Sequence, residues 1–126
     1  LYKVQKAKFT LHENIEFCLS NHNLSGYANY DKKFVICTEN IKNNVEDYSP
    51  YINEVVLHES VHAAQLCNGN RAFGISKKDM VMPLYKVKNV EASIQYASSS
   101  YMIEYEAYWM EDKPEKVNYV LQKYCF

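Results

Sequence analysis

The sequence predicts a small α+β domain that is mostly helical and contains a small β-sheet. Several stretches show helical periodicity or helix-end residues, and two short stretches rich in tyrosine and β-branched residues lie between them. No internal repeat, low-complexity tract or linker divides the 126 residues, of which 48% are hydrophobic. A chain of this size forms about one domain, so we expect residues 1–126 to be a single domain.

The first third of the chain predicts one helix followed by two strands. The segment TLHE has the Thr-x-x-Glu form of a capping box, with Thr10 as N-cap and Glu13 returning a hydrogen bond. We expect a helix of about three turns from there to the asparagines at 21–23. The segments GYANYD and KFVICTE, residues 26–31 and 33–39, predict neighbouring strands or a hairpin.

A buried helix is predicted in the middle of the chain. Ser49 and Pro50 make a good N-cap and first-turn pair, because the missing N–H of proline costs nothing there. The helix should run to Cys67, where Gly69 provides a left-handed stop. Glu59 is the only formally charged side chain between Val55 and Cys67, so most faces should be buried.

The last third predicts irregular chain at residues 70–88 and then two helical stretches. The first should run from about Asn89 to Asp112, where the serines at 98–100 can bend or interrupt it. The second opens at Pro114, and its apolar residues follow helical spacing: Val117, Val120, Leu121 and Tyr124.

Charge and hydropathy exclude two classes of partner. The 14 basic and 15 acidic residues are balanced and scattered, which argues against a nucleic-acid partner. No apolar run approaches the roughly 20 residues of a membrane-spanning helix. Because the chain begins with Leu1, a leader, an anchor or a further domain can precede it, and the sequence assigns no compartment and no oligomeric state.

The four cysteines leave two interpretations open. Their wide spacing, without a Cys-x-x-Cys pair, argues against a structural zinc knuckle. Their even number permits two disulfides in any of three pairings, and four buried free thiols are the alternative.

The segment LHESVH contains the strongest functional signal. His58 and His62 are four residues apart, so on a helix both imidazoles project from one face at the separation that two ligands of one zinc ion require. Glu59 would then lie over the open position of the metal as a general base for a water molecule. The alternative is that both histidines are ordinary core residues, but unpaired imidazoles in so apolar a helix would be costly.

A third protein ligand is expected from the second long helical stretch. Glu104 is the first candidate, since Ala107 one turn later allows its helix to approach the zinc helix closely. Glu106 points about 200° away from Glu104, so both cannot face the metal, and it remains an alternative together with Glu91. His12 and His22 are expected at the surface or in capping positions, and the nearby tyrosines are expected to pack without catalytic roles.

His58-Glu59-x-x-His62 followed by Glu104-x-x-Ala107 resembles the gluzincin class of zinc metallopeptidases. The segments at 26–41 and 57–67 also resemble the small processing peptidases of mitochondrial ATP-synthase assembly. The chain departs from the class at Tyr108, where many gluzincins carry an aspartate that orients the first histidine. It departs from the mitochondrial type in its longer gap between His62 and Glu104 and in its fewer cysteines.

The resemblance implies a minimal zincin fold in which the zinc helix packs beside the small sheet. It also implies zinc-dependent peptide hydrolysis, with zinc held by His58, His62 and Glu104, Glu59 as general base, and a peptide or protein substrate. An edge strand of the sheet would bind the substrate by main-chain pairing, and residues 33–39 are the candidate unless they form an internal strand. The alternative function is a catalytically silent zinc-binding module with the same fold.

Overall fold

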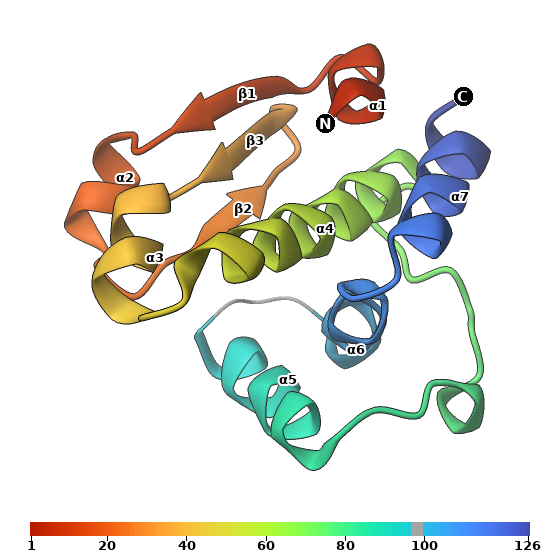
Figure 1. Cartoon of the computed structure of the whole chain (residues 1–126). Helices are drawn as coiled ribbons and strands as arrows, with labels where there is room; N and C mark the ends of the chain where they lie inside the picture. The colour runs from red at the N-terminus through yellow and green to blue at the C-terminus, as the bar shows by residue number, and fades with distance from the viewer. Residues whose placement is uncertain (97–99) are drawn as a thin grey trace.

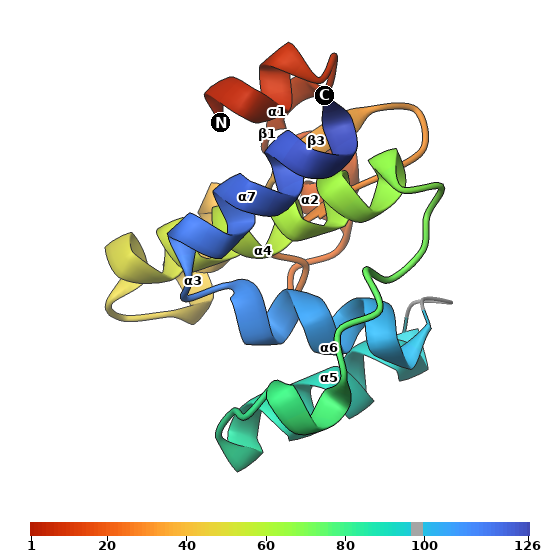
Figure 2. The same ribbon diagram turned by 90° about the vertical axis from the view of Figure 1, so that its right-hand side faces the viewer.

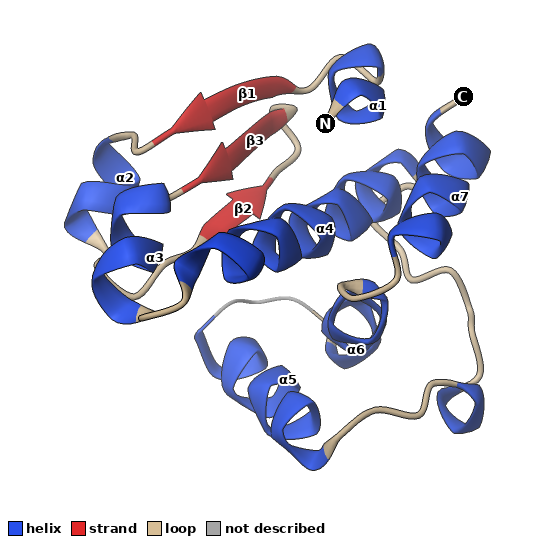
Figure 3. Cartoon of the chain, viewed as in Figure 1, coloured by secondary structure: helices blue, strands red, loops and turns tan. Residues whose placement is uncertain are grey.

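The structure is a computed structural model that describes residues 1–96 and 100–126. It is about 60% helical and contains a small three-stranded sheet, which confirms the predicted α+β class (Figure 3). The elements in chain order are α1 (Tyr2–Lys6), β1 (Thr10–Glu13), α2 (Glu16–Ser20), β2 (Gly26–Ala28), β3 (Lys33–Ile36), α3 (Thr38–Asn44), α4 (Tyr48–Cys67), the 3₁₀ turn η1 (Lys77–Asp79), α5 (Leu84–Tyr96), α6 (Tyr101–Met110) and α7 (Pro114–Cys125).

The sheet has the strand order β1-β3-β2. β1 runs parallel to β3, with Thr10 opposite Lys33, while β2 runs antiparallel to β3 as the predicted hairpin partner. β3 is therefore an internal strand, which confirms that alternative, and residues 33–39 as the substrate-binding edge strand are wrong. The strand also ends at Ile36, because the chain turns into α3, a helix that the sequence analysis missed. The edge strand beside α4 is β2 (Figure 1).

The predicted capping box at residues 10–13 is also wrong, because these residues form β1. The parallel ladder with β3 supplies backbone partners there, so no helix N-terminus needs capping. Thr10 Oγ1 lies 3.0 Å from Nε2 of His12, and Glu13 accepts a hydrogen bond from Thr38 Oγ1 at 2.6 Å. The helix of this region is the shorter α2, which ends next to Asn21 as expected.

α4 is the central element of the fold. It begins at Tyr48, close to the predicted start, and ends at Cys67, before Gly69 adopts a left-handed φ of 73°. The sheet lies on one side of α4, whereas α6 and then α5 lie on the other (Figure 1). α7 runs beside α4 and packs on it (Figure 2). Buried side chains on several faces of α4 confirm the prediction from its low charge: Val55, Val61, Ala63 and Ala64.

The predicted helical stretch from 89 to 112 consists of two helices, α5 and α6. α5 begins earlier than expected, at Leu84, and Ser100 caps α6 by accepting a hydrogen bond from the backbone N–H of Ile103 at 3.3 Å. Ser98 and Ser99, which were also expected to interrupt the helix, lie outside the described residues. α7 begins at Pro114 as predicted. No helix in the described ranges is long and apolar enough to cross a membrane.

Both cysteine pairs form disulfides, so the alternative of four free thiols is wrong. Cys18–Cys37 ties α2 to the end of β3, and Cys67–Cys125 ties the C-terminal end of α4 to that of α7. The second bond closes a chain separation of 58 residues and fixes α7 along the helix that carries the two histidines.

Candidate metal centre

α4 places His58 and His62 on one face, as the four-residue spacing requires. Their ring centroids are 4.9 Å apart, and both residues are largely buried, with 9% of His58 exposed. The apolar and small residues around them on α4 pack into the core, so these two imidazoles are polar groups that need partners inside the protein.

The third member of the cluster is Glu104 from α6. One of its carboxylate oxygens lies 2.7 Å from Nε2 of His62, and the other lies 3.8 Å from Nε2 of His58. One ligand atom from each residue lies within 4.8 Å of the other two, so the three residues form a group that could hold a metal ion. The predicted ligands are therefore brought together by the fold, although Glu104 is more than 40 positions from His62.

The two other carboxylates considered as ligands lie elsewhere. Glu106 is fully buried and accepts hydrogen bonds from the backbone N–H groups of Phe73 and Gly74 at 2.9 and 3.2 Å. It also accepts from Nε2 of Gln65 at 3.0 Å. Glu91 is exposed on α5 and is not part of the cluster. Glu106 therefore holds the loop after α4 in place, while Glu104 faces the histidines.

Each histidine has a partner behind it. Nδ1 of His58 lies 2.8 Å from a carboxylate oxygen of Glu111, and Nδ1 of His62 lies 2.8 Å from the side-chain oxygen of Gln65. Because both partner atoms are acceptors, each Nδ1 carries a proton, and both Nε2 atoms face Glu104. Acceptors behind metal-binding histidines fix the tautomer and the ring orientation in this way.

Sequence reasoning missed Glu111 and Gln65. The spacing of both residues could have indicated them. Gln65 follows His62 by three residues and Glu111 follows Glu104 by seven, so each lies on the same helix face as a predicted ligand. The resemblance directed attention to Tyr108 instead, the position of the orienting aspartate in many gluzincins. In this chain the contact with Nδ1 of the first histidine comes from Glu111, the C-cap residue of α6, three residues after Tyr108.

The pKa values of the two histidines shift in opposite directions. Burial lowers the pKa of His58, so this imidazole stays neutral. Burial opposes protonation of His62 as well, but the hydrogen bond and charge of Glu104 outweigh it and raise the pKa of His62 to about 9. In the metal-free protein His62 and Glu104 therefore form a charged pair, in which a proton occupies the position that a metal ion would take.

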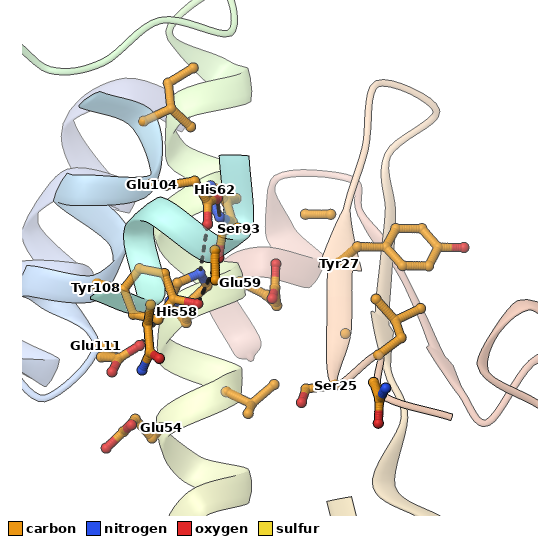
Figure 4. Close-up of a pocket in the computed structure, with 18 of the residues that line it drawn as sticks. Ser25, Tyr27, Glu54, His58, Glu59, His62, Ser93, Glu104, Tyr108 and Glu111 are labelled. Carbon is orange, nitrogen blue, oxygen red and sulfur yellow. Dashed lines mark hydrogen bonds and ion pairs between the residues drawn. The ribbon is translucent and has the colours of Figure 1, made fainter. Parts of the chain in front are cut away.

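Glu59 is the predicted general base and lies beside this pair. It is 7% exposed, and Figure 4 shows its side chain on the side of α4 that faces β2. A Cβ atom added to Gly26 in β2 would lie 3.5 Å from Cγ of Glu59, so strand and carboxylate are close neighbours. Burial raises the pKa of Glu59, although the neighbouring histidines counteract it.

A large cleft of about 1510 Å³ exposes the cluster to solvent. Residues of α4, β2, α5 and α6 line this cleft, and Figure 4 labels several residues from each side of it. His22 is exposed and lines this cleft, as expected for a surface residue, whereas His12 is a half-buried residue of β1. The candidate metal group contains neither of them.

Tyr108 differs from the packing role expected for the tyrosines of α6. Its ring meets His58 edge-on at 4.5 Å, and its hydroxyl lies 2.9 Å from Oγ of Ser93 on α5. It lines the cleft, and burial raises its pKa to about 12, so the hydroxyl keeps its proton at neutral pH. Tyr105, by contrast, is a core residue whose hydroxyl donates to the carbonyl of Met80.

Comparison with known families gives one match. The model of the domain of unknown function DUF8637 matches residues 1–126. The chain belongs to the DUF8637 family. The site described above is therefore the site of a DUF8637 domain, whose description carries no activity. Searches of curated proteins and of solved structures found no match.

Proposed function

We propose that this DUF8637 domain is a zinc-dependent peptidase of the gluzincin type. The observation that carries the proposal is the carboxylate of Glu104 placed between the Nε2 atoms of His58 and His62, with Glu59 beside them at the base of a cleft. Two imidazoles and one carboxylate are the protein ligands of many catalytic zinc sites, which leave the fourth position open.

The distances support zinc as the ion. Zinc ligands at about 2.0–2.1 Å in a tetrahedron lie about 3.3 Å from one another. The separations of 2.7 and 3.8 Å between Glu104 and the two Nε2 atoms lie on either side of that value. The hydrogen bonds at both Nδ1 atoms already orient the two rings.

Each residue of the site has a defined role in this proposal. His58, His62 and Glu104 hold the ion, which when bound supplies Lewis acidity toward water and a substrate carbonyl. Glu59 accepts the proton of the attacking water and transfers it to the leaving amine nitrogen. Burial raises the pKa of Glu59 above its ordinary value, which makes this carboxylate a stronger proton acceptor.

The edge strand β2 is the proposed substrate-binding strand. Its residues Gly26–Ala28 line the cleft opposite the metal group, and the other edge of β2 is paired with β3. An extended peptide could add to the free edge by main-chain hydrogen bonds, which place a scissile carbonyl between β2 and α4. Gly26 has no room for a side chain, since an added Cβ would lie 2.5 Å from the carbonyl oxygen of Val35.

The test compares the wild type with Glu59→Gln for zinc content and for cleavage of casein or a peptide library. We expect an active wild type and a variant that binds zinc equally well but cleaves about 10²–10⁴-fold more slowly, because only the base is lost. A zinc-loaded wild type that cleaves nothing would instead identify the chain as a silent zinc-binding module. A wild type that binds no zinc would refute both.

A further inference from the structure

A buried lysine stands behind the metal centre, on the far side of Glu111 from His58. Lys86 of α5 is only 2% exposed, and its Nζ lies 3.2 Å from Oε2 of Glu111. The other oxygen of the same carboxylate, Oε1, is the one that accepts from His58 at 2.8 Å. Glu111 therefore contacts the ammonium group of Lys86 on α5 with one oxygen and the imidazole of His58 on α4 with the other.

Lys86 has two further contacts that fix its position. Its Nζ donates to the backbone carbonyl of Tyr108 at 3.1 Å and lies 3.4 Å from a carboxylate oxygen of Asp112. Burial opposes its positive charge, but the neighbouring carboxylates outweigh this effect and raise its pKa. Lys86 therefore remains a cation in the interior, where its charge is neutralised chiefly by Glu111.

We propose that Lys86 is a positioning residue for the metal centre, which acts through Glu111 on His58. Burial of a carboxylate without a neutralising cation costs free energy. Without Lys86, the side chain of Glu111 would therefore be less firmly held against Nδ1 of His58. With Lys86 in place, the carboxylate of Glu111 stays against Nδ1 of His58, and His58 presents Nε2 to the ion. This inference rests on the proposed zinc site.

The same contacts give α5 a function in the site. α5 packs on α6, and its Ser93 contacts the hydroxyl of Tyr108, the residue whose carbonyl accepts from Lys86. Lys86 and Ser93 of α5 thus both contact Tyr108 of α6, the helix that carries Glu104. The helix that forms one wall of the cleft also stabilises the orientation of the first zinc ligand.

The experiment measures zinc affinity by competition with a chelator in Lys86→Met, Glu111→Gln and the double variant. Lys88→Met is the matched control, because Lys88 lies on the same helix and is exposed. We expect Lys86→Met to bind zinc about 10–100-fold more weakly and Lys88→Met to bind like the wild type. In the Glu111→Gln background, Lys86→Met should change the affinity less than about twofold, because the effect travels through Glu111.

Three results would overturn the inference. The first is equal zinc affinity in Lys86→Met and Lys88→Met. The second is a loss of zinc affinity on Lys86→Met that is as large in the Glu111→Gln background as in the wild type, which would indicate general damage to α5. If Lys86→Met does not unfold cooperatively, Lys86→Gln replaces it, since Gln keeps a donor for the carbonyl of Tyr108. The third is a wild type without zinc affinity, which overturns the proposed function too, whereas a zinc-binding wild type without peptidase activity counts against the hydrolase alone.

Discussion

Glu111 lies 2.8 Å from Nδ1 of His58, although 53 residues separate the two in the chain. The contact exists because α6 packs on α4 and presents Glu104 and Glu111 toward the same imidazole, one at Nε2 and the other at Nδ1. A single helix therefore provides a candidate zinc ligand and the group that orients another.

Substitution of Glu111 should weaken metal binding without removing a ligand. In Glu111→Gln, we expect zinc affinity to fall about 10–100-fold, because a neutral amide no longer holds His58 as strongly by its Nδ1–H. Glu115→Gln is the control, since this carboxylate is exposed in the first turn of α7. Chelator competition gives both affinities, and equal values in the two variants would show that Glu111 does not orient the ligand.

Glu104→Ala and Glu106→Ala should separate a metal ligand from a structural carboxylate. Loss of Glu104 should abolish most zinc binding, since it removes one of three ligands. Loss of Glu106 leaves buried donors of Phe73, Gly74 and Gln65 without their acceptor, which should cost about 3 kcal/mol or more of unfolding free energy. Denaturant unfolding and zinc content measure the two effects, and zinc loss in Glu106→Ala with normal binding in Glu104→Ala would reverse the assignment.

Zinc binding should release protons and strengthen with pH. Because the pKa of His62 is about 9 in the metal-free protein, an ion that binds at pH 7 must displace about one proton. Apparent affinity should therefore rise up to about tenfold per pH unit and level off above about pH 9. Calorimetry in buffers of different ionisation enthalpy counts the protons, and a count near zero at pH 7 would contradict the His62–Glu104 pair.

The same raised pKa predicts how the stability of the metal-free protein depends on pH. The folded-state pKa of His62 lies above its ordinary value of 6.5, so its stabilising contribution is complete below about pH 6.5 and is lost as the pH rises through about 9. His62→Gln should reduce this dependence, and denaturant unfolding of the metal-free chain at pH 6 and pH 9 measures it.

The two disulfides should contribute unequally to stability. In the chain-entropy account, Cys67–Cys125, with a separation of 58, contributes about 4 kcal/mol, and Cys18–Cys37, with a separation of 19, about 3 kcal/mol. Paired Cys→Ser variants measured by denaturant unfolding test the order. Intact-mass measurement before and after reduction should detect four thiols only in the reduced chain, and four thiols in unreduced protein would exclude both bonds.

Elements with strong local signals were predicted well. α4 and α7 lie close to their predicted positions, and the β2–β3 hairpin formed as expected, but the N-cap of α4 is Asp47 and not Ser49. The capping box at Thr10 failed because its backbone pairs with β3, a strand more than 20 residues away, and this sheet pairing overrides the local preference. The position of β3 inside the sheet was decided in the same way, by the arrival of β1 on its other side.

The sequence by itself determined the spacing of His58, Glu59 and His62, because helical geometry turns a four-residue interval into one shared face. It also singled out Glu104 among the acidic residues of the later helical stretch. Tertiary structure alone decided that Glu111 and Lys86 support His58, that β2 is the free edge, and how the cysteines pair. Those relationships depend on how α5, α6 and the sheet pack around α4, and packing between distant segments leaves no periodic trace in the chain.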